Sequence, residues 1–213
     1  MVTDSIYEQF RKPNLATFQK KLCPSAKLPF YGIAIPSLRL IARTVLFEDI
    51  TITYHEDVIL KGLALGLEKT SFLNKIERLN SLLPYLSSWD HTDTIVTAFK
   101  AKGPESEMMM KYFASLLKSK DTFTKRLGIV WLMLNRNEVD YYEALELIIG
   151  ADDGDDYYVM MAVSWALSFY ALDGKDISKE LEIVSENTKK MTERKIKESK
   201  RTSKNLKIES FKM

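Results

Sequence analysis

SWDHTD, the stretch Ser88–Asp93, is the part of the chain on which the prediction of the fold depends. Its tryptophan, Trp89, is followed after 37 residues by Arg126, and Arg126 is followed after 39 residues by Trp165. A recurrence near 40 residues is typical of helix-pair solenoids, in which each repeat covers the apolar face of its neighbour. Equivalent helices of such a stack lie side by side along one concave wall. We therefore expect Trp89, Arg126, Trp165 and Asp93 to share one wall.

Apolar residues recur at intervals of three and four along most of the chain, which predicts helices. Every proline lies within residues 1–104, so little interrupts helices in the second half. Ile50–Tyr54, ITITY, alternates like a strand, but it is short and isolated, and we interpret it as a loop or helix end. Beyond the helix that starts near Trp89, helices are expected at about 105–119, 121–134, 138–150, 155–172, 176–187 and 191–202. The fold class is therefore all-α, an antiparallel stack of about ten to thirteen helices.

The composition is that of an ordinary globular chain of one domain. The 213 residues are 46% hydrophobic and 28% charged, and one cysteine, Cys23, excludes an internal disulfide. The N-terminus lacks a signal pattern, and no apolar run approaches the roughly 20 residues of a membrane span. We expect a cytoplasmic protein with one domain over residues 1–213 and a frayed tail at about 203–213.

The charge of the chain is unevenly distributed. Residues 189–213 carry ten Lys or Arg and three Glu, whereas residues 1–188 have a net charge of −5. A basic end on a mildly acidic body suits an anionic polymer such as a nucleic acid. The simpler interpretation is a solvated final helix, and charge alone does not decide between them.

Trp89 and Asp93 are four residues apart, so on a helix their side chains project from one face. Ser88 is expected to cap this helix, and Asp90 to lie in its favourable first turn. An indole can pack on a sugar or base, and a nearby carboxylate can stabilise positive charge or orient water. Taken singly, each residue is explained as well by a core tryptophan and a first-turn acid.

Arg126 and Trp165 are the other two candidates. A guanidinium at the start of an apolar helix suits a bidentate contact to a phosphate or carboxylate, although a surface ion pair explains it equally well. Trp165 lies in the most apolar helix, where a core tryptophan is natural. Ser164 and Ser168 lie four residues apart in that helix, so we expect a narrow polar stripe that faces a groove.

Other kinds of site are poorly supported. The two histidines, His55 and His91, and the single Cys23 do not make a familiar zinc pattern, and nothing in the sequence points to ligation with carboxylates. GxxxxGK[ST], GxGxxG and GxSxG are all absent from the sequence. We therefore expect no metal, no nucleotide cofactor and no nucleophile elbow.

At the candidate residues the sequence resembles the AlkD-type DNA alkylation repair family, a group of DNA glycosylases built from HEAT-like repeats. SWDHTD is similar to the family's W-D-x-x-D element, and Phe30–Arg43, FYGIAIPSLRLIAR, is similar to its GI-x-x-P-x-x-R segment. The other matching segments are YHEDVILKGLALG (Tyr54–Gly66), TKRLGIVWLM (Thr124–Met133), YYVMMAVSWALS (Tyr157–Ser168) and ERKIKESKR (Glu193–Arg201). Their order and spacing are those of the family, so the resemblance covers most of the chain.

The resemblance implies a right-handed α-solenoid, an α-α superhelix of HEAT-like repeats with a concave groove. In that family the groove holds duplex DNA that carries a cationic alkylpurine, such as a 3-methyl or 7-methyl base. By resemblance, Asp93 is catalytic, because it would stabilise the positive charge that develops on the deoxyribose and position water. Trp89 and Trp165 would contact the sugar and backbone of the lesion, and Arg126 would hold a nearby phosphate. We expect duplex DNA as the partner, no membrane, and a monomer.

Two departures from the family pattern leave the activity open. The region before Gly32 lacks the pattern of the N-terminal helical element that enters the minor groove in family glycosylases, and Ser168 replaces a basic residue of many active members. The first hypothesis is a glycosylase that hydrolyses the N-glycosidic bond of cationic alkylpurines in duplex DNA. The alternative is a noncatalytic HEAT-like-repeat protein that binds DNA weakly, or another macromolecule, having lost lesion recognition. A third interpretation limits the resemblance to the fold.

Overall fold

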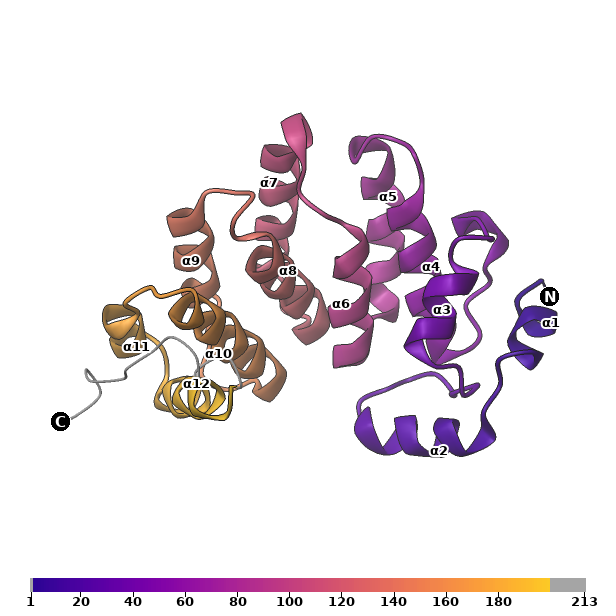
Figure 1. Ribbon diagram of the computed structural model, residues 1–213, viewed down its shortest axis with the longest axis horizontal. Coiled ribbons are helices and arrows are strands. Elements are labelled where there is room, and N and C mark those ends of the chain that lie inside the picture. The colour runs from indigo at the N-terminus through magenta and orange to yellow at the C-terminus, as the bar shows by residue number, and fades with distance from the viewer. Residues whose placement is uncertain (1, 200–213) are drawn as a thin grey trace. The chain divides into compact units, whose positions relative to one another are not determined.

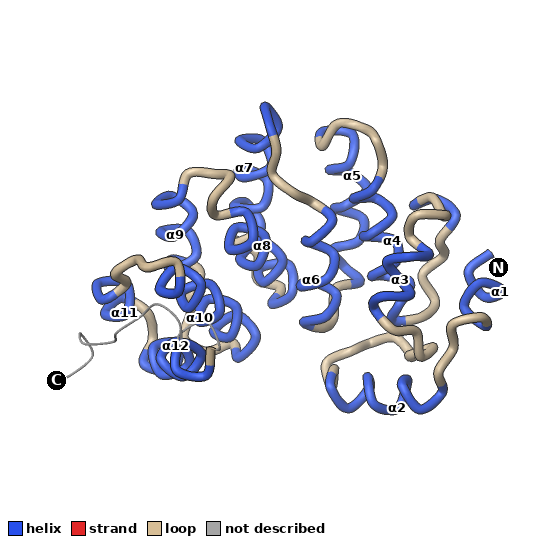
Figure 2. The backbone as a smooth tube through the Cα atoms, viewed as in Figure 1, coloured by secondary structure: helices blue, strands red, loops and turns tan. Residues whose placement is uncertain are grey.

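The structure is a computed structural model that describes residues 2–199, with side chains from Ser5 onward. This part of the chain forms twelve α-helices and four short 3-10 helices and holds no strand, so the all-α prediction is confirmed (Figures 1 and 2). Residues 51–54 form a loop, as the interpretation of ITITY required. The predicted frayed tail at 203–213 lies outside the described residues. Between residues 2 and 199, no helix is long and apolar enough to cross a membrane.

The chain divides into two compact units, Met1–Tyr112 and Phe113–Met213. The first unit contains α1 (Val2–Glu8), α2 (Pro13–Leu22), α3 (Ile35–Ile41), η1 (Phe47–Asp49), α4 (His55–Leu67), α5 (Leu73–Leu82), η2 (Leu83–Tyr85), α6 (Trp89–Ile95), η3 (Val96–Ala98) and η4 (Gly103–Glu105). Helix α7 (Ser106–Leu116) begins in the first unit and ends in the second. The second unit contains α8 (Thr122–Asn135), α9 (Tyr141–Gly150), α10 (Tyr157–Leu172), α11 (Ser178–Ile183) and α12 (Glu186–Glu198).

Helix α4 is the centre of the first unit, where it packs against α3, α5 and α6. Its two glycines permit this close packing. A Cβ atom at Gly62 would lie 2.6 Å from the side chain of Ile95, and one at Gly66 would lie 2.3 Å from the Cβ of Ala98. Contacts this short do not occur between real side chains, so the approach of α4 to the end of α6 and to η3 requires glycine. The second half of α4 is thereby held against the end of α6 and against η3.

Helices α8, α10 and α12 form the main packing series of the second unit. Helix α10 packs against both α8 and α12, and α9 packs against α8 and α10 (Figure 1). Asp121, Asp140, Asp156 and Ser185 cap four of these helices, because each side chain accepts a hydrogen bond from a backbone N–H of the first turn. This packing is the local arrangement that a solenoid needs, whereas the superhelix and its concave groove stay a prediction.

The expected helix boundaries are correct to a few residues except near the C-terminal end of the described chain. We expected helices at 176–187 and 191–202, but α11 ends at Ile183 and α12 begins at Glu186. Ser185 accounts for the difference, because its Oγ accepts a hydrogen bond from the N–H of Thr188 at 3.3 Å and starts a new helix. The basic residues from Lys189 to Lys197 therefore lie on one helix, α12, that packs against α10.

Candidate functional site

Trp89 is the first residue of α6, as expected, and it is half-buried. Its Nε1 donates a hydrogen bond to the carbonyl oxygen of Leu22, the last residue of α2, at 3.1 Å. Ser88 occupies the N-cap position, but the expected cap by its side chain is wrong. Its hydroxyl donates to the carboxylate of Asp90 instead, because that carboxylate is buried and accepts hydrogen bonds from several donors. The indole is thus held between α6 and α2, with part of its surface exposed.

Asp93 lies one turn after Trp89 on α6, and its side chain is also half-buried. One of its oxygens, Oδ1, accepts a hydrogen bond from the hydroxyl of Thr92 at 3.0 Å. The same hydroxyl is 2.8 Å from the carbonyl oxygen of Trp89. Residues 89, 92 and 93 therefore form a short polar chain along one side of the helix. An acid in this position is oriented by its neighbours and still reaches solvent.

Arg126 lies deeper than a surface ion pair would, with 4% of its surface exposed. It belongs to the first turns of α8, and its Nη1 donates to the carbonyl oxygen of Tyr158 at 2.8 Å. Tyr158 lies in the first turn of α10, two helical turns before Trp165, so residues 158 and 165 lie on the same side of that helix. Trp165 itself is half-buried and meets the ring of Phe169 edge-on at 6.0 Å.

The expected polar stripe of Ser164 and Ser168 is wrong. Both residues are buried, with exposed fractions of 0% and 3%. The hydroxyl of Ser164 donates to the carbonyl oxygens of Met160 and of Thr188 in α12, and that of Ser168 donates to the carbonyl oxygen of Trp165. Small hydroxyls that satisfy backbone carbonyls let α10 and α12 approach closely, which explains serines in an otherwise apolar helix.

The four predicted site residues divide between the two units, with two residues in each. Trp89 and Asp93 share a face of α6, and Arg126 and Trp165 belong to two helices, α8 and α10, that pack against each other. Of the basic residues at the C-terminal end of the chain, Lys190, Arg194 and Lys197 are exposed on α12, and those from 200 onward lie outside the described residues. The second unit therefore presents cations on a helix adjacent to the one that carries Trp165.

The region before Gly32, which lacks the sequence pattern of the family element, does contain two helices, α1 and α2. Pro13 lies in the first turn of α2, where proline is compatible with a helix. None of the residues of α2 is buried, and its exposed apolar side chains Phe18 and Leu22 are accompanied by Lys20 and Lys21. The missing pattern therefore does not mean a missing helix.

A buried polar cluster next to Trp89 is the feature that the sequence interpretation missed. His55 Nε2 lies 3.1 and 2.9 Å from the two carboxylate oxygens of Asp90, and the donor atoms of Cys23, His55 and Asp90 all lie within 4.8 Å of one another. Burial alone would raise the pKa of Asp90, but the hydrogen bonds that its carboxylate accepts from His55 and Ser88 outweigh it and hold that pKa at about 2. The carboxylate is therefore ionised at neutral pH.

The thiol of Cys23 in the same cluster is unsuited to nucleophilic catalysis. Burial, reinforced by the negative charge of Asp90, raises the pKa of Cys23 to about 12. A thiol with such a pKa supplies almost no thiolate at neutral pH. His55 and Asp90 are 35 residues apart, which is close to the repeat spacing of the candidate residues. This spacing is the sequence signal by which their meeting at the starts of two helices could have been predicted.

The ring of His91 stacks on the ring of His55, with ring centroids 3.9 Å apart. Its Nδ1 accepts a hydrogen bond from the N–H of Ser87, and its Nε2 donates to the carbonyl oxygen of His55. Burial lowers the pKa of His91 to about 3, so this ring is neutral in the folded chain. Both of its nitrogens are committed to the backbone, which fixes α6 against the start of α4.

The sequence matches the family described as DNA alkylation repair enzyme over residues 5–202. The match covers nearly the whole chain, and it includes all four predicted site residues, so this protein belongs to that family. Comparison with curated proteins and with solved structures gives no match. The family membership agrees with the resemblance found in the sequence.

Proposed function

We propose that this protein is a DNA glycosylase that hydrolyses the N-glycosidic bond of cationic alkylpurines, of the 3-methyl or 7-methyl kind, in duplex DNA. One observation carries the proposal. In a chain of the DNA alkylation repair enzyme family, Trp89 and Asp93 lie one turn apart on α6, and both side chains are half-exposed. An indole beside an oriented carboxylate is what a site for a developing sugar cation needs.

The reaction needs little help from a general acid, because the base is already cationic. The bond between C1′ and the ring nitrogen breaks with its electron pair going to the nitrogen, so the base leaves neutral. Positive charge then develops on the deoxyribose, and the Asp93 carboxylate stabilises it through space. Water adds to C1′ and loses one proton, which Asp93 or solvent accepts. The hydrogen bond from Thr92 to Oδ1 orients the Asp93 carboxylate for this work.

The second unit supplies contacts to the DNA backbone in this proposal. The half-buried indole of Trp165 would pack against the sugar of the lesion, and the exposed cations of α12 would lie along phosphates. Arg126, whose Nη1 donates to the carbonyl oxygen of Tyr158, would hold the phosphate nearest the lesion. Placing both pairs on one duplex requires the concave wall of a right-handed HEAT-like solenoid, which forms part of the proposal, as do a monomer and a cytoplasmic location.

The test is release of methylated purines from an alkylated DNA duplex. We expect wild-type protein to release them and Asp93→Asn to slow release by about 10²-fold to 10³-fold, the usual loss when a charge-stabilising group is removed. Asp155→Asn, which changes an exposed acid of the second unit, is the matched control and should keep the wild-type rate. Release by wild-type protein that does not exceed release by Asp93→Asn would remove the enzymatic assignment.

A second candidate function, a noncatalytic DNA-binding protein, is favoured by a specific observation. The N–H of Trp89 is used by Leu22, and Arg126 is 4% exposed, so two of the four predicted contacts are already committed within the protein. This function predicts equal affinity for alkylated and intact duplexes and no base release. The dependence of the binding constant on salt separates it from binding of another partner, since phosphate contacts give a steep negative slope.

A further inference from the structure

The polar cluster of the first unit gathers three different metal-binding side chains at one point. Cys23 follows α2, His55 begins α4, and Asp90 lies in the first turn of α6. Their donor atoms lie within 4.8 Å of one another, although 67 residues separate the first from the last. All three residues are buried, with exposed fractions of 3%, 0% and 8%. Three segments of the chain therefore meet at these side chains.

The donor set is one that zinc prefers. Thiolate, imidazole and carboxylate are its usual protein ligands, at about 2.0–2.3 Å, which places tetrahedral donors on the order of 3.5 Å apart. His55 Nε2 and the Asp90 oxygens, at 2.9 and 3.1 Å, need to separate by only a fraction of an ångström to admit an ion. A thiolate and a carboxylate also carry two negative charges, which a divalent cation neutralises in a buried site.

The surroundings of the cluster hold two of the three ligands in place. Asp90 accepts a hydrogen bond from the N–H of His91 at 3.0 Å and another from the hydroxyl of Ser88. The ring of His55 lies between the rings of Phe30 and His91, at centroid distances of 4.2 and 3.9 Å. Supporting contacts of this kind orient metal ligands before the metal binds.

Metal binding at His55 requires that the proton on its ring change position, which has a free-energy cost. When Nε2 donates to Asp90, Nδ1 is left buried without a hydrogen-bond partner among the described residues. A metal ion bound at Nε2 would move the proton to Nδ1. Nδ1 is an unpaired acceptor without the metal, and it would become an unpaired N–H donor with the metal. An unpaired N–H costs far less than a zinc–thiolate and a zinc–imidazole bond supply. The exchange of protons therefore does not prevent binding.

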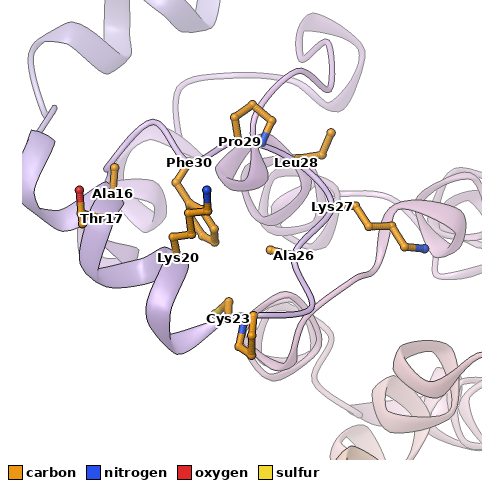
Figure 3. A pocket seen from close by; sticks show the side chains of 10 residues that line it. Ala16, Thr17, Lys20, Cys23, Ala26, Lys27, Leu28, Pro29 and Phe30 are labelled. Carbon is orange, nitrogen blue, oxygen red and sulfur yellow. The ribbon is translucent and has the colours of Figure 1, made fainter.

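The cluster also has a path to solvent. Cys23 lies on the wall of a pocket of about 590 Å³ between α2 and residues 24–30, with Lys20 and Phe30 on the same wall (Figure 3). An ion would enter the site from this pocket, since Cys23 is one of its lining residues. Because the chain offers three ligands here, a water molecule from the pocket would complete a four-coordinate site.

We propose that Cys23, His55 and Asp90 bind one zinc ion, which joins α2, α4 and α6. Binding forms bonds from the metal to the thiolate sulfur, to Nε2 and to a carboxylate oxygen. The thiol proton is released to solvent, and the imidazole proton moves from Nε2 to Nδ1. The site is next to the candidate tryptophan, since Leu22, which accepts the hydrogen bond from Trp89, directly precedes Cys23. Zinc therefore holds in place the end of α2, to which the indole of Trp89 donates its hydrogen bond. The zinc site does not depend on glycosylase activity.

The test uses cobalt(II), which replaces zinc and reports its ligands by absorption. We expect reduced wild-type protein to bind one equivalent of cobalt, with tetrahedral visible bands and a near-ultraviolet sulfur-to-cobalt charge-transfer band that zinc then removes. Cys23 is the only cysteine of the chain, so this band identifies its ligation without any variant. A folded, reduced chain that shows no charge-transfer band with stoichiometric cobalt overturns the proposal.

Variants then assign the other ligands. Cys23→Ser should lose the charge-transfer band and bind zinc at least about 100-fold more weakly, while circular dichroism without metal stays that of wild type. Asp90→Asn should also weaken binding, whereas the matched control Asp155→Asn should not. If Cys23→Ser binds zinc as tightly as wild type, the site is elsewhere and the proposal is wrong. Loss of base release has no bearing on these readouts, so the zinc site and the glycosylase activity fail independently.

Discussion

The two units of this protein are stabilised in different ways. The first unit buries polar side chains at the junction of α4 and α6, among them His55, Glu56, Asp90 and His91. The second unit relies on apolar helices, since α8 and α10 bury eleven and nine residues, and on four side-chain caps. Both units have an apolar core, and the first unit adds to its core a network of buried charged and polar groups where α4 and α6 begin.

This difference agrees with the proposed function, in which the first unit carries Asp93 and the second unit contacts the DNA backbone. Buried hydrogen-bond networks fix one geometry, and the network of the first unit is next to Trp89, whose indole donates to the residue that precedes Cys23. A packed apolar stack supplies a rigid surface without special chemistry, which is enough for contacts to sugar and phosphate. The comparison predicts that stability is lost through cavities in the second unit and through unpaired polar groups in the first.

The largest effect on stability is expected from Trp131→Ala in the second unit. Trp131 is fully buried and stacks on Phe113 with ring centroids 4.4 Å apart, so truncation leaves a large cavity. We expect the free energy of unfolding to fall by about 3–5 kcal/mol. Hydrogen exchange read by mass spectrometry should show the loss of protection chiefly in residues 113–199. Equal loss throughout residues 2–112 would mean that the two units do not have separate cores.

A somewhat smaller effect is expected from Glu56→Gln in the first unit. The Glu56 carboxylate is fully buried and accepts hydrogen bonds from the N–H groups of Tyr31, Gly32 and Ile33 at 2.9, 2.8 and 3.1 Å. An amide keeps one acceptor oxygen and turns an NH₂ group toward a backbone donor. We expect a loss of about 3 kcal/mol in urea unfolding, whereas Glu138→Gln, at an exposed acid, should change little.

The first unit should also be the more sensitive to acid because of His91. Its pKa is lowered from 6.5 to about 3 in the folded chain, so below pH 6.5 the unfolded chain binds a proton that the folded chain does not. Stability from this group is fully present above pH 6.5 and falls as the pH drops toward 3. Between pH 7 and pH 5 we expect a loss of about 2 kcal/mol in urea unfolding with a chelator present.

His91→Asn removes the titrating group and serves as the comparison for this pH effect. Its free energy of unfolding should be lower than that of wild type at pH 7, because the stacking on His55 is lost. Its further decrease between pH 7 and pH 5 should be smaller than the decrease in wild type by about 2 kcal/mol. The same decrease in both proteins would assign the acid sensitivity to other groups.

The smallest predicted effect concerns DNA affinity. Trp165→Ala should weaken binding to an alkylated duplex about tenfold, because one stacking surface is lost. Trp89→Ala should weaken binding similarly, and it should also increase hydrogen exchange in α2, since Leu22 loses the hydrogen bond from the indole. Tyr142→Ala, which removes an aromatic ring that is 73% exposed, is the control and should leave affinity unchanged.

The sequence was sufficient for the helical fold and for the helices on which the four candidate residues lie. Helical spacing placed Trp89 and Asp93 on one face, and the distance from Arg126 to Trp165 placed them on packed helices. It failed where a side chain had two possible partners. Ser88 bonds to Asp90 rather than to a helix N–H, and Ser164 bonds to α12 rather than lining a groove. Such choices depend on tertiary neighbours, which local patterns do not contain.

The buried cluster of Cys23, His55 and Asp90 is a second feature that local sequence patterns could not predict in full. His55 and Asp90 have a repeat-like spacing that indicates neighbouring helix starts, but Cys23 belongs to a segment with no repeat signal. Its position depends on the path of residues 24–30 between α2 and α3. Periodicity describes helices, so a ligand contributed by an irregular segment is found only when the chain is folded.

The proposed function requires that the pair on α6 and the pair on α8 and α10 act on the same lesion. A double-mutant cycle of Trp89→Ala and Trp165→Ala, read as the single-turnover rate of methylated-purine release, tests it most directly. Two indoles that contact one nucleotide share a partner, so we predict a coupling of at least about 0.5 kcal/mol between the two substitutions. Normal release by Trp165→Ala, with a rate lost only in Trp89→Ala, would contradict the claim.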